Sequence, residues 1–149
     1  MSEKKRFKSF AAIFLVLMRG REILLLRRAN TGYQDGNYSL VAGHLEGGET
    51  VKQGIIREAK EEANIDMNLE DLEVVHVMHR YRPAREYFDV YLRAEKWSGE
   101  IFNKEPDKCD ELKWFDVSKL PDNMVPEIRQ ALEKIGNNIH YSEIGWDNK

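Results

Sequence analysis

Glutamates are concentrated in one short stretch, residues 43–65, and their spacing could hold a metal ion. Glu58, Glu61 and Glu62 stand three and four residues apart, which places them on one side of a helix. Like charges at this spacing repel by roughly 0.2–0.5 kcal/mol per pair. A sequence that accepts this repulsion often binds a divalent cation, because hard cations such as magnesium prefer carboxylate oxygen. We therefore expect a carboxylate site for such a cation here.

A helix over residues 50–63 is predicted to carry these side chains. Thr50, followed three residues later by Gln53, forms the capping-box pattern that marks a helix start. Apolar residues then recur every four positions and form one buried stripe. At 100° per residue, Glu58 and Glu62 lie along the edge of that stripe, so they do not point straight into solvent.

Two residues of this helix carry further information. Gly54, in its middle, costs about 1 kcal/mol relative to alanine, which predicts a close approach by a loop or a substrate at that point. Asn64 tolerates the left-handed backbone conformation, so the helix is expected to end there.

The rest of the chain has mainly the pattern of strands. Two apolar runs separated by a glycine-containing turn predict a β-hairpin, and the Asn-, Gly- and Asp-rich segment 29–37 predicts a loop. A second helix is predicted over Pro126–Ile135, ending before Gly136, while 137–149 shows no clear period. Strands around one strong helix indicate an α/β or α+β class with a mixed sheet. The expected strands are Phe10–Met18, Ile23–Arg28, Tyr38–Val41 (leading into a loop at 43–48), Leu72–Tyr81, Tyr87–Trp97 and Glu111–Phe115.

Length and composition predict one globular domain, 1–149, with a polar tail at 1–8. The net charge is −3, so no global positive field favours duplex nucleic acid. The apolar run 10–18 imitates a signal peptide, but it is too short to span a bilayer and no small-residue cleavage site follows, which favours a buried strand and no membrane partner. Cys109 is the only cysteine, which excludes an intrachain disulfide and favours the cytoplasm.

The glutamate-rich stretch resembles a known signature. Gly43, five residues, Glu49, seven residues and then Arg57–Ile65 is similar to the Nudix box, which runs Gly, five residues, Glu, seven residues, Arg-Glu, aliphatic, any, Glu-Glu, any, Gly, aliphatic. Every charged position and the leading glycine match in register. Asn64 replaces the usual glycine, and it is the next-best residue for positive φ. Ala42 replaces a proline often found before the leading glycine.

The resemblance to Nudix hydrolases of the MutT type implies both a fold and a reaction. The fold would be an α/β/α sandwich around a mixed β-sheet. The reaction would be Mg²⁺-dependent cleavage of a pyrophosphate linkage in a nucleoside diphosphate derivative, with Mn²⁺ as a substitute and a nucleoside triphosphate as the expected substrate. The alternatives are ADP-ribose, a dinucleoside polyphosphate, RNA 5′ ends, or a non-catalytic nucleotide sensor on the same fold. A homodimer is left open.

The resemblance also implies metal ligands. Glu58 and Glu62 are the expected carboxylate ligands, with the main-chain oxygen of Gly43 as a third and Glu61 binding directly or through water. Arg57 would orient Glu58 or Glu61, and Glu49 of the signature would pair with that arginine.

Two residues are candidates for the general base. Glu58 is one candidate. Glu105 is the other, since its loop resembles the one in which some MutT-type members carry an extra acidic ligand. Asp110 and Glu111 are fallback candidates for the base. A carboxylate near the attacking water is all the step needs.

The substrate side of the cleft is predicted from the loop before the signature. Tyr33 and Tyr38 could stack on a base or pack the glycine-rich loop. Arg28 could meet a phosphate, as could one or two of Arg27, Arg80, Arg82 and Arg85. His44 could touch phosphate or be held by a backbone partner, and Trp146 could close a cleft or a dimer interface.

Overall fold

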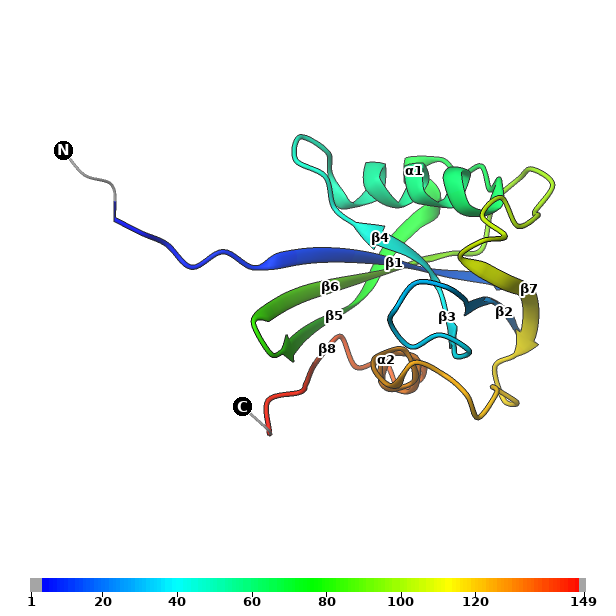
Figure 1. Ribbon diagram of the computed structural model, residues 1–149. Coiled ribbons are helices and arrows are strands. Elements are labelled where there is room, and N and C mark those ends of the chain that lie inside the picture. Colours follow the sequence, from blue (N-terminus) through cyan, green and yellow to red (C-terminus); the bar gives the residue numbers. More distant parts are fainter. Residues whose placement is uncertain (1–3, 148–149) are drawn as a thin grey trace.

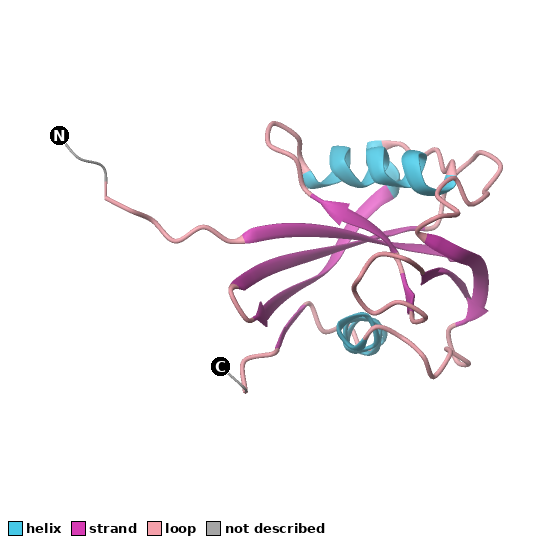
Figure 2. Cartoon of the chain, viewed as in Figure 1, coloured by secondary structure: helices cyan, strands magenta, loops and turns pink. Residues whose placement is uncertain are grey.

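The computed structural model describes residues 4–147. Two helices lie on opposite faces of a strongly twisted sheet (Figures 1 and 2). The elements in chain order are β1 (Phe10–Arg19), β2 (Glu22–Arg28), β3 (Tyr38–Ser39), β4 (Val41–His44), α1 (Val51–Ala63), a 3₁₀ turn (Leu69–Asp71), β5 (Leu72–Arg82), β6 (Arg85–Ala94), β7 (Cys109–Asp116), α2 (Pro126–Gly136) and β8 (Tyr141–Ile144).

The sheet mixes parallel and antiparallel pairs, as predicted. β1 runs parallel to β6, β6 is antiparallel to β5, and β5 is parallel to β8. The predicted hairpin of β1 and β2 is paired only beside its turn, at Met18–Ile23 and Arg19–Glu22. Beyond that point β2 separates from β1 and pairs with β3 and β7, while β1 pairs with β4. This separation opens the space that becomes the cleft.

The apolar run 10–18 is a central strand that is buried on both faces. Ile13, Leu15 and Leu17 pack into the core under α1. Phe14 and Val16, on the alternate positions, pack into the core over α2. A strand covered on both sides has a continuous apolar sequence, because each side chain enters one of two cores. The buried-strand interpretation of this run is therefore confirmed.

Helix α1 begins and ends where the sequence indicates. Thr50 is its N-cap, and both hydrogen bonds of the capping box with Gln53 are present. Asn64 is the C-cap, in the left-handed conformation with φ 59°. Its side-chain amide also donates to the main-chain oxygen of Glu100 at 3.0 Å, a contact that glycine would lack.

Other boundaries differ from the predictions. The expected strand 38–41 is broken at Leu40, and β4 runs on through Gly43 into the expected loop. Helix α2 includes Gly136. Strand β8 was missed, because four residues are too few to show a period and its partner lies more than sixty residues earlier in the chain. None of the helices in residues 4–147 is long and apolar enough to cross a bilayer.

The close approach at Gly54 gives a stability prediction. A Cβ there would stand 2.7 Å from Cδ1 of the fully buried Ile13 and 2.9 Å from Oε2 of Glu49. Gly54→Ala should therefore lower the free energy of unfolding by about 1–3 kcal/mol through overpacking, although alanine favours a helix. Urea denaturation measures this. Gly136→Ala is the control, since a Cβ at Gly136 meets open space, and equal stability of the two variants would contradict the packing argument.

Candidate active site

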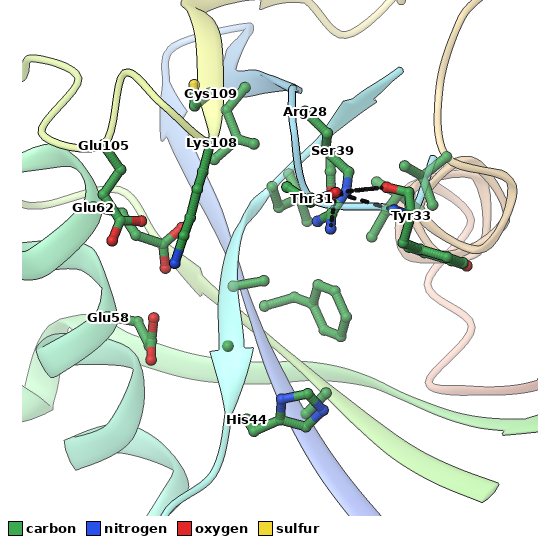
Figure 3. A pocket seen from close by; sticks show the side chains of 18 of the residues that line it. Arg28, Thr31, Tyr33, Ser39, His44, Glu58, Glu62, Glu105, Lys108 and Cys109 are labelled. Atoms are coloured by element: carbon green, nitrogen blue, oxygen red, sulfur yellow. Dashed lines mark hydrogen bonds between the residues drawn. The ribbon is translucent and has the colours of Figure 1, made fainter. Parts of the chain in front are cut away.

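A cleft of about 740 Å³ opens between β4, the end of α1 and the loop before β7 (Figure 3). One wall is acidic, and the predicted Glu58, Glu61, Glu62 and Glu105 all line it. The opposite side carries arginines and tyrosines, among them Arg28, Tyr33, Arg82, Arg85 and Tyr87. The cleft therefore has one end suited to a cation and another suited to phosphates and an aromatic ring.

Gly43 and Glu58 are in direct contact at the acidic wall. Gly43 is held in β4 by its pairing with Ile13 of β1. A Cβ on Gly43 would stand 2.3 Å from Cδ and 2.4 Å from Oε1 of Glu58. The carboxyl group thus occupies the space of the missing side chain, and only glycine allows the strand and this carboxylate to meet.

Glu62 is the most strongly perturbed acid of the wall. Burial first, and then the neighbouring Glu58, raise the pKa of Glu62 to about 10. One carboxylate oxygen of Glu62, Oε2, is buried without a hydrogen-bond partner. A buried acceptor that lacks a donor, next to a second carboxylate, is an arrangement that a cation would satisfy.

The donor set fits a hard divalent cation. Within residues 4–147, no three acidic, histidine or cysteine side chains already converge on one point. The Glu58–Glu62 pair would therefore need main-chain oxygen, as at Gly43, or movement of Glu61 or Glu105. Oxygen ligands of this kind are the ones magnesium and manganese use.

Arg57 holds the acidic wall from behind and does not line the cleft. Its Nε and Nη2 bond the two carboxylate oxygens of Glu49 at 3.1 and 2.9 Å, which is the predicted clamp. Its Nη1 donates to Oε1 of Glu58 at 2.7 Å and to Oε2 of Glu61 at 3.5 Å. These hydrogen bonds raise the pKa of Arg57, and the same pairing lowers the pKa of Glu49.

The remaining acids separate into two groups. Glu61 is more than half exposed and turned toward Arg57. Glu105 lies close enough to Glu62 to raise its pKa. Asp110 and Glu111 do not line the cleft: Asp110 bonds Arg27 at 2.7 Å, and Glu111 accepts a hydrogen bond from the Tyr38 hydroxyl. These two are withdrawn as candidates for the base.

Tyr38 was wrongly expected in the substrate pocket. Its ring is buried, packed edge-on against Phe115 at 5.0 Å, and it supports the wall from inside the core. In β3, both Tyr38 and Ser39 are buried, so the side chain of Tyr38 faces the core. Trp146 does not line the cleft either: its Nε1 donates to the main-chain oxygen of His79.

Tyr33, Arg28 and His44 do line the cleft. The guanidinium group of Arg82 lies 4.3 Å from the ring centre of Tyr33. Arg28 donates to the main-chain oxygen of Tyr33 at 2.7 Å, which fixes the loop that carries the ring. The His44 ring stands at the edge, 5.8 Å from that of Tyr87.

A buried ionic group on the cleft floor was missed. Arg80 bonds Asp89 through Nε at 2.6 Å and Nη2 at 3.0 Å, and its Nη1 lies 3.4 Å from Glu127 of α2. Tyr33 donates to the same Glu127 oxygen at 2.6 Å, and burial first, then this bond, raises the pKa of Tyr33 to about 12. The sequence contained one sign of this ionic group, because Asp89 is a charged residue inside a largely apolar strand.

Comparison with known proteins decides the family. A family model described as NUDIX domain matches residues 7–135. The chain belongs to the Nudix family. The resemblance stated from the box is thereby confirmed, and the mixed sheet between two helices is the fold of its solved relatives. An enzyme of the Nudix hydrolase type is the assignment that this membership supports.

Individual relatives agree with the Nudix assignment. NAD-capped RNA hydrolase NudC of Pseudomonas aeruginosa (strain LESB58) is 32% identical over 111 residues, which cover 74% of this chain and 37% of that protein. The match thus spans little more than a third of the relative's length. The MutT NUDIX hydrolase of Burkholderia pseudomallei superposes with a TM-score of 0.78 at 26% identity, over 85% of this chain and 98% of that one. The MutT protein of Methanosarcina mazei Go1 (TM-score 0.75, 17% identity, 90% and 97% coverage) shows the fold alone.

The contact at Gly43 yields a prediction about metal binding. Gly43→Ala should leave the fold intact, because the clashing group is the flexible end of Glu58, but it should displace that carboxylate. We expect Mn²⁺ affinity to fall roughly tenfold or more, as measured by calorimetric titration. Gly47→Ala, where a Cβ meets open space, is the control. Unchanged Mn²⁺ affinity in Gly43→Ala would show that the Glu58–Gly43 contact does not contribute to metal binding.

The raised pKa of Glu62 yields a prediction about pH. The folded state keeps this proton up to about pH 10, whereas the unfolded chain loses it near 4.5. The metal-free protein should therefore lose stability as pH rises between these values. Glu62→Gln removes that penalty, so with EDTA its advantage over the parent in free energy of unfolding should be small at pH 5 and should grow toward pH 8 by at most about 1.4 kcal/mol per pH unit.

Thermal unfolding at pH 5, 6.5 and 8 measures the difference between Glu62→Gln and the parent. Added Mg²⁺ should stabilise the parent but not the variant. A difference that is constant across this pH range would show that Glu62 is ionised normally in the folded protein.

Proposed function

We propose that this chain is a metal-dependent pyrophosphohydrolase that cleaves a pyrophosphate linkage in a nucleoside diphosphate derivative. The observation that carries the proposal is the partly buried pair Glu58–Glu62, with Glu58 packed on Gly43, facing a cleft lined by arginines. A cation held there would neutralise the pyrophosphate and stabilise the charge that develops in the transition state.

Each side chain then has a role that its position supports. Glu58, Glu62 and the Gly43 carbonyl would hold Mg²⁺ or Mn²⁺, with Glu61 joining directly or through water. Arg57 keeps Glu58 turned toward β4. The carboxylate that accepts the proton of the attacking water is Glu58 or Glu105.

The arginine side of the cleft suits the rest of a nucleotide. Tyr33 presents an aromatic ring that Arg82 and Glu127 hold in place, and a base can stack on such a ring. Arg28 and Arg82 can bind phosphate oxygens. A cleft with these parts at both ends supports an enzyme over a sensor, because a sensor has no need of the carboxylate pair.

A nucleoside triphosphate remains the expected substrate, and ADP-ribose and dinucleoside polyphosphates remain alternatives. One further class has support from relatives: the NudC proteins are described as NAD-capped RNA hydrolases, which favours an NAD-capped RNA 5′ end. A single domain, a cytoplasmic location and a homodimer stay predictions.

A substrate panel tests the function. The purified chain should release product from at least one of the nucleoside triphosphates, ADP-ribose, NAD or NAD-capped RNA, only when Mg²⁺ or Mn²⁺ is present. Glu62→Gln should lower kcat by about 10³-fold or more through loss of a ligand. Chromatography of the products identifies the bond cleaved. Lys119→Gln, an exposed change outside the cleft, is the control, and full activity of Glu62→Gln would end the assignment.

A further inference from the structure

Lys108 brings a cation to the acidic wall, from the loop between β6 and β7. Its side chain lines the cleft, and Figure 3 shows it extending into the cavity toward Glu62. Four carboxylates line the same cleft on this wall, at Glu58, Glu61, Glu62 and Glu105. Arg57, which neutralises part of this charge, does so from behind the wall. Lys108 therefore faces the space in which a substrate would lie.

The backbone of Lys108 is fixed on both sides. Its N–H donates to the main-chain oxygen of Glu105 at 2.9 Å, and its own oxygen accepts from the N–H of Ala29 at 2.9 Å. The same loop is tied to α1, since the N–H of Lys104 donates to the main-chain oxygen of Glu62 at 3.0 Å. Asn30 adds a side-chain bond to the main-chain oxygen of Asp107 at 3.0 Å. The side chain of Lys108 thus starts from a defined point above the carboxylate pair.

The charges on this wall change when a divalent cation binds. Without the cation, the ammonium group of Lys108 is attracted by those of the four acids that are ionised. A cation held by Glu58 and Glu62 would take these two side chains as ligands and would repel the ammonium group. A pyrophosphate that then enters brings oxygen anions to the same place. The favourable partner of Lys108 in the loaded cleft is accordingly a phosphate oxygen.

We propose that Lys108 forms a phosphate subsite beside the Glu58–Glu62 pair and binds a phosphate of the pyrophosphate linkage. This inference rests on the function proposed above. In the reaction, the water oxygen bonds to phosphorus, the bond from phosphorus to the bridging oxygen breaks, and the proton of the water passes to a carboxylate. Lys108 keeps its own protons and donates hydrogen bonds to the phosphate as negative charge grows on it.

Three variants separate this role from a structural one. Lys108→Met removes the charge and keeps most of the length. Lys108→Arg restores a cation. Lys104→Met is the matched control, because Lys104 lies on the same loop but its ammonium group donates to the main-chain oxygen of Lys60, away from the cleft lining.

Two binding measurements need no turnover. Calorimetric titration with Mn²⁺ alone should show about threefold tighter binding to Lys108→Met than to the parent, because a like charge near the cation is gone. Titration with inorganic pyrophosphate at saturating Mn²⁺ should show about tenfold weaker binding to Lys108→Met. Lys108→Arg should keep most of the pyrophosphate affinity, and Lys104→Met should match the parent in both titrations.

Turnover supplies the third measurement. With the best substrate of the panel, kcat/KM of Lys108→Met should fall about 10–100-fold, and Lys108→Arg should recover most of the loss. If Lys108→Met binds pyrophosphate as tightly as the parent, the subsite is overturned. If Lys108→Met binds both Mn²⁺ alone and pyrophosphate more weakly than the parent, the loop is distorted and the subsite is also overturned. If the parent hydrolyses nothing while the pyrophosphate result holds, the proposed function fails and the subsite stands.

Discussion

The candidate site depends on one guanidinium group placed among carboxylates. Arg57 bonds Glu49 through two nitrogens and Glu58 through a third, and it reaches Glu61 at 3.5 Å. Without this cation, acids on one helix face and its preceding loop would repel one another. A planar fork suits the task, because it can bind several carboxylates in fixed directions. The arginine thus lets the cleft carry a concentration of negative charge that an isolated helix would not tolerate.

One buried residue, Ile13, sets the geometry of the acidic wall. Ile13 pairs with Gly43 across β1 and β4, and a Cβ on Gly54 of α1 would meet the Cδ1 of Ile13 at 2.7 Å. Strand and helix therefore both rest on the same point of β1. Two glycines permit the two approaches, one for the strand to meet Glu58 and one for the helix to meet the sheet. The separation between the main-chain oxygen and the carboxylates follows from that packing.

Local features could be predicted from the sequence, and features set by distant contacts could not. The capping box, the left-handed Asn64 and the glutamate spacing each depend on a few neighbouring residues, so their patterns are sufficient. Tyr38 was misplaced because whether a tyrosine points into a core or a cleft depends on the strand it pairs with. The floor of the cleft joins residues from β5, β6 and α2 that no local pattern connects; they are Arg80, Asp89 and Glu127. Lys108 was missed because a lysine in a polar loop looks like any other exposed lysine.

The division of the cleft into two ends has a consequence for the order of binding. A pyrophosphate that approaches the acidic wall meets carboxylates, with Lys108 as the opposing charge on the cleft side. The arginines at the other end can hold one part of a nucleotide, but they cannot offset that repulsion at the bond to be cleaved. On the proposed function, the cation is therefore required for the substrate to settle against the wall as well as for the reaction. Without a cation, the acidic wall would bind phosphate poorly. With a cation bound, the wall would be selective, because only a ligand that also coordinates the cation could bind there.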